Sequence, residues 1–266
     1  MEPSLLTVII LGIVEGVTEF LPVSSTGHLI LAGTLLGWHG EASKTFDIVI
    51  QLGAILAIVV LYWRRFAQVI TGLAARQKGS IAFTRNVLLG FLPSMLIGAL
   101  VYSAIKAMME SPRVVAIALI LGGIAILVIE RLVKKHHIHS VEGMSARTAL
   151  GIGLIQCLSM IPGVSRSGAT IMGALTLGVD RKTAAEFSFF VAVPTMLAAS
   201  AYDMYKSHGH LGAESVDAIA IGFVISFIVA MVVVKAFVAL ISRYGFGPFA
   251  WYRIIAGGVA LLWLSL

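Results

Sequence analysis

The chain alternates between long apolar stretches and short polar connectors. Six apolar stretches of near-spanning length occur along it, over residues 48–63, 87–102, 114–129, 187–202, 218–234 and 251–266. A helix of about 20 residues crosses the roughly 30 Å hydrocarbon core of a bilayer. Each of these stretches is therefore predicted to be a membrane-spanning helix, and the fold class to be an all-α polytopic membrane protein.

Two further apolar segments, 5–36 and 149–178, are interrupted by the polar runs LPVSSTG and IPGVSRSG. Proline, glycine and serine supply turn geometry and helix caps. Non-helical backbone is tolerated at membrane depth only where protein or a watery cavity covers it. Both segments are therefore predicted to be re-entrant helical hairpins that enter and leave the membrane on the same side.

The sequence aligns with itself. Residues 23–37, VSSTGHLILAGTLLG, lie over residues 164–178, VSRSGATIMGALTLG, with identities that include serine and glycine in the polar break. Apolar segments seldom align such residues by chance. We expect one integral membrane domain made of two related repeats, each a hairpin followed by three spans, at about 1–133 and 149–266, joined by the polar connector 134–148.

Three full spans per repeat is an odd number, so the second repeat should be inverted relative to the first. If the connector 64–85 is cytoplasmic, most of the 19 lysines and arginines fall on the cytoplasmic side, as topology signals do, and both termini lie outside. If the first hairpin spans fully instead, the N-terminus moves inside. An inverted repeat with broken helices places its site near the midplane, where the two breaks meet.

Composition agrees with a membrane protein and excludes other classes. The 266-residue chain is 59% hydrophobic and 12% charged, with a mean hydropathy of +0.99, whereas soluble domains carry roughly 25% charged residues. The net charge of +6 lies mainly in connectors, so no nucleic-acid partner is expected. The single cysteine, Cys157, excludes an internal disulfide. The N-terminal MEPSLLTVIILG lacks the basic region of a cleavable signal and is treated as retained.

Two carboxylates stand inside the first interrupted segment. Glu15 and Glu19 are one helical turn apart, so both project from one face. An ionised glutamate within a membrane segment is costly and indicates a functional site. The alternative is a helix end with both side chains solvated. Because like charges repel, the pair predicts a bridging divalent cation, Mg²⁺ or Ca²⁺, if the site receives an anionic substrate.

Ser25, His28 and Arg166 are the other candidate catalytic residues. A hydroxyl near a histidine can be activated as a nucleophile, although a lone histidine in an apolar helix is often structural. Arg166 occupies the position equivalent to Ser25 in the second repeat. A guanidinium there can bind phosphate bidentately; the structural alternative is an ion pair with Glu15 or Glu19.

The two breaks also predict phosphate-binding backbone. Free N–H groups at a helix N-terminus form an anion site, and each break precedes such a terminus. The expected phosphate-binding residues are Ser24, Thr26, Gly27, Ser165, Ser167, Gly168 and Thr170. Phosphoryl transfer requires positive charge on the oxygens, a nucleophile and a proton shuttle, and the set provides all three. Gln51, Glu186 and Arg253 are ambiguous between structural and functional roles.

At these residues the sequence resembles the undecaprenyl-diphosphate phosphatase family, also called the bacitracin-resistance protein family. The motifs are EGVTEFLPVSSTGH (15–28) and PGVSRSGAT (162–170). The similarity extends over essentially the whole chain, including FDIVIQLGAILA (46–57) and EFSFFVAVPTM (186–196). No motif position departs from the family's pattern.

The resemblance implies hydrolysis of undecaprenyl diphosphate to undecaprenyl phosphate and inorganic phosphate, on the outer side of the bacterial inner (plasma) membrane. This reaction recycles the carrier lipid for peptidoglycan and other cell-wall polymers. Because bacitracin sequesters the substrate, abundant enzyme confers resistance. The resemblance also implies a divalent cation and roles for Glu15, Glu19, Ser25, His28 and Arg166. We expect Ser25 to be the nucleophile, with His28 as base or acid.

Other readings stay open at this stage. Inverted repeats with broken helices are typical of secondary transporters, and a flippase for polyprenyl phosphate has the same architecture. SSTGH also suggests the acid-phosphatase-like lipid phosphatases, but Met172 stands where their second motif requires histidine. The nucleophile (Ser25, His28 or a metal-activated water), homodimer formation and chain-length selectivity are left undecided by the sequence.

Overall fold

The computed structural model describes residues 4–38, 41–207 and 216–265, and within them every regular element is helical. This confirms the all-α polytopic prediction. Among these residues, four helices are long and apolar enough to cross a membrane: α5 (Lys78–Leu100), α7 (Pro112–Leu132), α10 (Arg181–Ser207) and α11 (Val216–Tyr244). A fifth span is possible by length where α3 (Glu41–Leu61) and α4 (Trp63–Ala74) meet at a 69° bend.

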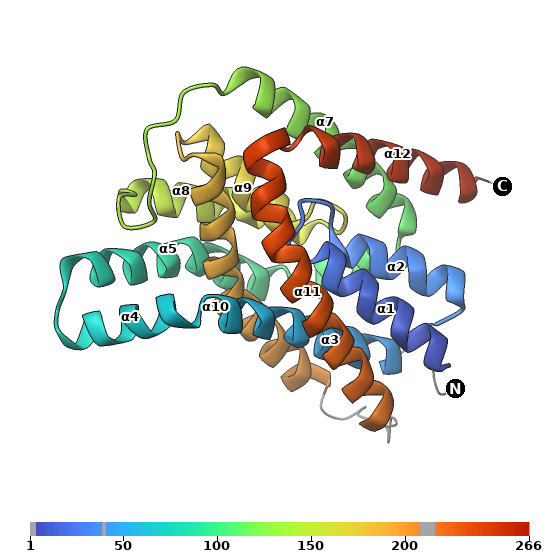
Figure 1. Ribbon diagram of the computed structural model, residues 1–266. Coiled ribbons are helices and arrows are strands. Elements are labelled where there is room, and N and C mark those ends of the chain that lie inside the picture. The colour runs from blue at the N-terminus through green and yellow to red at the C-terminus, as the bar shows by residue number, and fades with distance from the viewer. Residues whose placement is uncertain (1–3, 39–40, 208–215, 266) are drawn as a thin grey trace.

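Two predicted elements differ from the structure. The connector 64–85 is largely helical, because α4 and the first turns of α5 occupy it. Phe66, Val69, Ile70 and Leu73 recur at helical spacing there, and the neighbouring arginines conceal this periodicity. The last apolar stretch forms α12 (Gly247–Trp263), which has 17 residues and packs along α7 at the top of Figure 1.

Both interrupted segments are pairs of short helices that pack against each other. The first consists of α1 (Leu5–Thr18) and α2 (Ser25–Leu36). The second consists of α8 (Ala146–Gln156), the 3₁₀ turn η1 (Cys157–Met160) and α9 (Arg166–Thr176). All four α-helices are too short to span a bilayer alone. The chain breaks at the predicted polar runs, and the two breaks lie side by side near the centre of the molecule (Figure 1).

The N-termini of α2 and α9 have the same local structure. Ser24 and Ser165 are their N-caps, with positive φ angles of 73° and 80°. Their hydroxyls accept hydrogen bonds from Gly27 N–H at 3.3 Å and Gly168 N–H at 3.0 Å. Non-glycine residues seldom adopt a positive φ, so this shared strain marks both breaks as specialised backbone.

The packing of the two repeats is reciprocal. Helix α1 packs on α11, and its counterpart α8 packs on α5, while α7 and α12 pack on each other. Glycines allow the close approach: a Cβ on Gly16 would meet Ser226 O of α11, and one on Gly153 would meet Gly90 O of α5. This reciprocal packing is compatible with two related repeats; the repeat division and its inversion across the membrane stay predictions.

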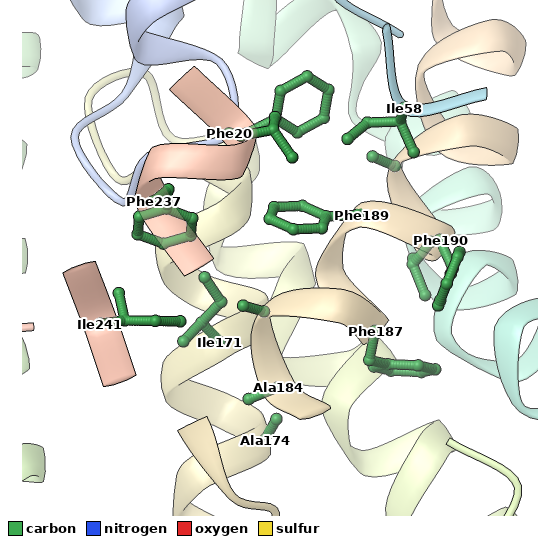
Figure 2. Close-up of a cluster of buried hydrophobic side chains, with 14 of the residues drawn as sticks. Phe20, Ile58, Ile171, Ala174, Ala184, Phe187, Phe189, Phe190, Phe237 and Ile241 are labelled. Atoms are coloured by element: carbon green, nitrogen blue, oxygen red, sulfur yellow. The ribbon is translucent and has the colours of Figure 1, made fainter. Parts of the chain in front are cut away.

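An aromatic cluster fills the core between the hairpins and the long helices (Figure 2). Phe189 of α10 lies at its centre, 5.6 Å from Phe20 in edge-to-face geometry and 6.1 Å from Phe237 of α11. Such pairs add about 0.5–1.5 kcal/mol beyond area burial. Phe20 directly follows Glu19, so the core holds the first break in place.

The connector 134–148 is packed against the helices. Ile138 forms a bridge with Val179, and His139 Nδ1 lies 2.9 Å from Asp180, the residue that caps α10. The buried amide of Asn86 donates to the carbonyls of Val141 and Met144 at 2.8 and 2.9 Å. The polar connector is thus held by specific hydrogen bonds to both repeats.

Adjacent glycines in α12 provide a test of the α7–α12 contact. A Cβ on Gly257 would lie 2.7 Å from Ala116 O, whereas one on Gly258 would meet nothing within 4 Å. Gly257→Leu should lower the free energy of unfolding by about 1–3 kcal/mol through overpacking. Thermal unfolding in detergent micelles measures the effect, and Gly258→Leu, the control, should unfold near the wild-type temperature. Equal unfolding temperatures for the two variants would contradict the packing described here.

Candidate active site

The two breaks open onto one cavity of about 700 Å³. Its polar end is lined by Glu19 and by residues at the N-termini of α2 and α9, namely Ser24, Ser25, Thr26, Ser165 and Arg166. The remainder is largely apolar and is formed by side chains of α3, α5, α6 (Tyr102–Met109) and α10. Sequence-predicted residues from both repeats therefore meet at one cavity, although Glu15 and His28 do not line it.

Glu19 is the centre of the polar end. Its carboxylate is nearly inaccessible and accepts hydrogen bonds from both breaks. Arg166 Nη2 donates to Oε1 at 2.8 Å, and Ser25 Oγ donates to Oε2. A buried ion pair is stable only when its remaining hydrogen-bonding capacity is satisfied. Both alternatives for Arg166 are compatible here, since it pairs with Glu19 and also lines the cavity.

Arg166 is oriented by four further contacts, one of which runs from Nη2 to Met196 Sδ at 3.6 Å. Nη1 donates to Ser188 O at 2.9 Å and to Ser188 Oγ at 3.1 Å, while the guanidinium stacks over the Phe20 ring at 5.5 Å. Its Nε is buried and has no hydrogen-bond partner among the described residues. The guanidinium is thus held rigidly at the cavity lining, and its one unpaired N–H is buried.

Glu15 lies one helical turn before Glu19, within α1, and is fully buried. Neither carboxylate oxygen has a hydrogen-bond donor in the described part of the chain. The charged groups that act on it are the carboxylates of Glu19 and Asp47 and the guanidinium of Arg166. Sequence reasoning missed Asp47, although an acidic residue close to a predicted span was a usable signal.

The predicted divalent cation can be tested against these observations. Mg²⁺ is commonly held by one or two carboxylates together with substrate phosphate oxygens. Glu15 offers two unused carboxylate oxygens beside Glu19. The described residues contain no group of three or more acidic, histidine or cysteine ligands. Glu19 lines the cavity, whereas Glu15 is fully buried outside its lining. The pair therefore offers carboxylate oxygens for a cation completed by the substrate, and does not form an all-protein metal site.

The His28 ring forms its hydrogen bonds with Ser24 and Tyr252 and not with Ser25. Its Nδ1 lies 2.7 Å from Ser24 O, and its Nε2 lies 2.7 Å from the hydroxyl of Tyr252, whose ring stacks on the imidazole. Because a carbonyl can only accept, Nδ1 carries the proton and Nε2 accepts from Tyr252. The imidazole supports the Ser24 turn, and its catalytic role stays a prediction.

The predicted phosphate-binding residues divide into two groups. Ser24, Thr26 and Ser165 line the cavity. The other four form hydrogen bonds within the protein. Ser167 Oγ donates to Leu21 O at 2.7 Å, and Thr170 Oγ1 donates to Gln156 Oε1 at 2.8 Å. The N–H groups of Gly27 and Gly168 donate to the capping serines. These four lie outside the cavity lining.

A second polar group, on other helices, also lines the cavity. Tyr102 OH donates to Asp203 Oδ1 at 2.5 Å, and Lys106 Nζ lies 2.7 Å from the same oxygen. Helices α6 and α10 carry these residues. Sequence reasoning missed the cluster, because its members are 101 positions apart and each looks like an ordinary connector residue.

The comparisons with known proteins agree along the full chain. The family model of the bacitracin resistance protein BacA matches residues 8–259. Curated relatives named undecaprenyl-diphosphatase include those of Rhizorhabdus wittichii, 67% identical over 99% of each chain, and Sphingopyxis alaskensis, 62% identical over 98% of each. The protein of the same name from Bordetella pertussis is 44% identical, over 98% of this chain and 96% of its own. The chain belongs to the BacA family of bacitracin resistance proteins.

Proposed function

We propose that this protein hydrolyses undecaprenyl diphosphate to undecaprenyl phosphate and inorganic phosphate, as the names of its relatives indicate for them. The observation that carries the proposal is the convergence of Ser25 and Arg166, from opposite repeats, on the buried Glu19. A hydroxyl nucleophile, a carboxylate base and a guanidinium that can bind phosphate therefore share one site. The apolar remainder of the cavity suits the start of a polyprenyl chain, the rest of which stays in lipid.

In the first step Ser25 Oγ attacks the terminal phosphorus. Its proton passes to Glu19, the carboxylate to which the hydroxyl already donates. The bond between this phosphorus and the bridging oxygen breaks, and undecaprenyl phosphate leaves with the bonding electron pair. Arg166 and the N-termini of α2 and α9 stabilise the charge on the phosphate oxygens. Glu19 replaces His28 as the base in this scheme, because the Ser25 hydroxyl donates to Glu19, whereas the His28 ring bonds to Ser24 and Tyr252.

In the second step water attacks the phosphoserine. The bond between phosphorus and Ser25 Oγ breaks, and Glu19 returns its proton to that oxygen. One proton of the water stays on the released phosphate and the other leaves to solvent. A divalent cation held by Glu15 and Glu19 would neutralise the charge of the diphosphate. Its requirement is part of this proposal.

The proposed location rests on the membrane spans and on the family resemblance. The spans make this a multi-pass membrane protein, and we place it in the bacterial inner membrane with the cavity open to the outer side. Recycling of the carrier lipid would then support peptidoglycan and other cell-wall polymers and confer bacitracin resistance. A transporter or flippase would need no nucleophile beside a carboxylate, and the named relatives favour the hydrolase.

The proposal is tested by phosphate release from a C55 diphosphate, with purified protein in detergent. Arg166→Lys should lower kcat by about 10²-fold or more, because lysine keeps the charge but loses the planar fork that contacts Glu19 and Ser188 together. Arg181→Lys is the matched control, since Arg181 pairs with Glu130 outside the cavity. Absence of release from the wild-type protein would refute the assignment, and an Arg166→Lys variant as active as the wild type would refute the role given to Arg166.

Removal of divalent cations tests the role of Glu15. A chelator should abolish phosphate release, and added Mg²⁺ or Ca²⁺ should restore it. Glu15→Gln should raise the cation concentration for half-maximal rate on the order of tenfold or more, because it removes one carboxylate ligand. Asp217→Asn, at an exposed carboxylate in the first turn of α11, should leave that concentration unchanged. Release that is insensitive to the chelator would argue against the cation.

Tyr252 and His28 can be separated by mutation. Tyr252→Phe removes one hydrogen bond to a ring that Ser24 still holds, so kcat should fall only about 2–10-fold, as expected from 0.5–1.5 kcal/mol. His28→Ala removes both bonds and should cost considerably more. The same phosphate-release assay measures both variants. Equal losses would show that the contact with Tyr252, and not the support of the Ser24 turn, is what matters.

A further inference from the structure

Arg253 is the largest fully buried side chain in the described part of the protein. It lies on α12 and reaches between α7 and the two breaks. Sequence reasoning could not decide whether it was structural or functional. A guanidinium without solvent requires a partner for every N–H group, since each unsatisfied donor is costly.

All five N–H groups of Arg253 are used, and every acceptor is a main-chain carbonyl. Nη1 donates to Pro22 O and Val164 O, both at 2.9 Å. Nη2 donates to Gly163 O at 2.9 Å and Ala118 O at 3.1 Å, and Nε donates to Leu119 O at 3.2 Å. The guanidinium therefore has no donor left for a phosphate, and it is not a substrate ligand.

Three of these carbonyls belong to the two breaks. Pro22 lies three residues before Ser25, and Val164 lies two residues before Arg166. The other two, on α7, belong to a long helix that packs along α12. One side chain thus bonds the backbone before the nucleophile and the backbone before the phosphate-binding arginine to the same helix pair.

Neighbouring glycines lie directly against the Arg253 guanidinium and leave it little room to move. A Cβ on Gly122 of α7 would collide with the guanidinium, and one on Gly168 would lie 3.3 Å from Nη1. Gly163, one of the acceptors, has a φ of 96°, which a side chain would disfavour. The guanidinium is therefore confined on several sides.

We propose that Arg253 is a positioning residue, which sets the distance between the Ser25 break and the Arg166 break without contacting substrate. Its catalytic consequence rests on the proposed phosphatase function, whereas its effect on the two breaks does not. Reacting groups held about 1 Å out of place can lose roughly 10²-fold in rate. A residue that merely stabilised the fold would change the amount of folded protein and not the rate per folded molecule.

Gly122→Ala is the deciding variant, because it displaces the guanidinium while keeping all its donors and every cavity residue. Gly258→Ala is its control, since a Cβ there meets nothing within 4 Å. Hydrogen exchange followed by mass spectrometry on the full chain in micelles should show faster exchange in both breaks, 19–28 and 158–168, for Gly122→Ala only. The kcat for phosphate release should fall about 10²-fold, with KM changed much less.

The outcomes separate the two proposals. Wild-type exchange in both breaks, or a kcat near that of wild type in folded Gly122→Ala protein, would overturn the positioning role. Faster exchange in one break alone would do so as well. If wild-type protein releases no phosphate, the proposed function fails, and the exchange data still decide the role of Arg253.

Arg253→Lys provides a second variant should Gly122→Ala fold poorly. Lysine has three donors, so at least two of the five carbonyls lose their partner. It should produce the same joint loosening of both breaks and a loss of kcat similar to that of Gly122→Ala. Normal exchange and kcat in folded Arg253→Lys protein would overturn the proposal.

Discussion

The buried ion pair between Glu19 and Arg166 is the interaction on which the site depends. Each partner comes from a different repeat, and neither charge could remain in this apolar setting without the other. Removing one would leave an uncompensated charge beside an aromatic core. The pair therefore fixes how the two hairpins face each other, and the hydroxyl of Ser25 is aligned because it completes the same carboxylate. The contacts that stabilise the buried charges are therefore the same contacts that position the reacting groups.

Much of the fold was accessible from the sequence because membrane segments obey simple rules of length and polarity. Three of the six predicted spans, 114–129, 187–202 and 218–234, fall within single helices, and the other three run past a helix end. Both breaks occur at the expected polar runs. The helix α4 escaped prediction, since its arginines made an amphipathic helix look like a connector. The packing of one helix on another, such as α1 on α11, depends on close contacts at glycines. The order of apolar and polar residues along the sequence does not specify these contacts.

The candidate site was predicted as a set of residues but not as a network. Glu19, Ser25 and Arg166 converge because Ser25 and Arg166 occupy equivalent positions in the two breaks, which meet at Glu19. The direction of each side chain was not predictable: His28 contacts Tyr252, which lies 224 positions away, and Arg253 contacts carbonyls from three segments. Backbone acceptors carry no signature in the sequence, so their partners emerge only from the structure.

The two N-cap serines are followed by different residues, and this difference limits how such a site can be assembled. Ser24 and Ser165 have matching backbone geometry, yet the next position is Ser25 in one repeat and Arg166 in the other. Two identical subunits related by a two-fold axis would present either two hydroxyls or two guanidiniums. An asymmetric pair around one carboxylate requires that both repeats belong to a single polypeptide, in which each copy is free to differ.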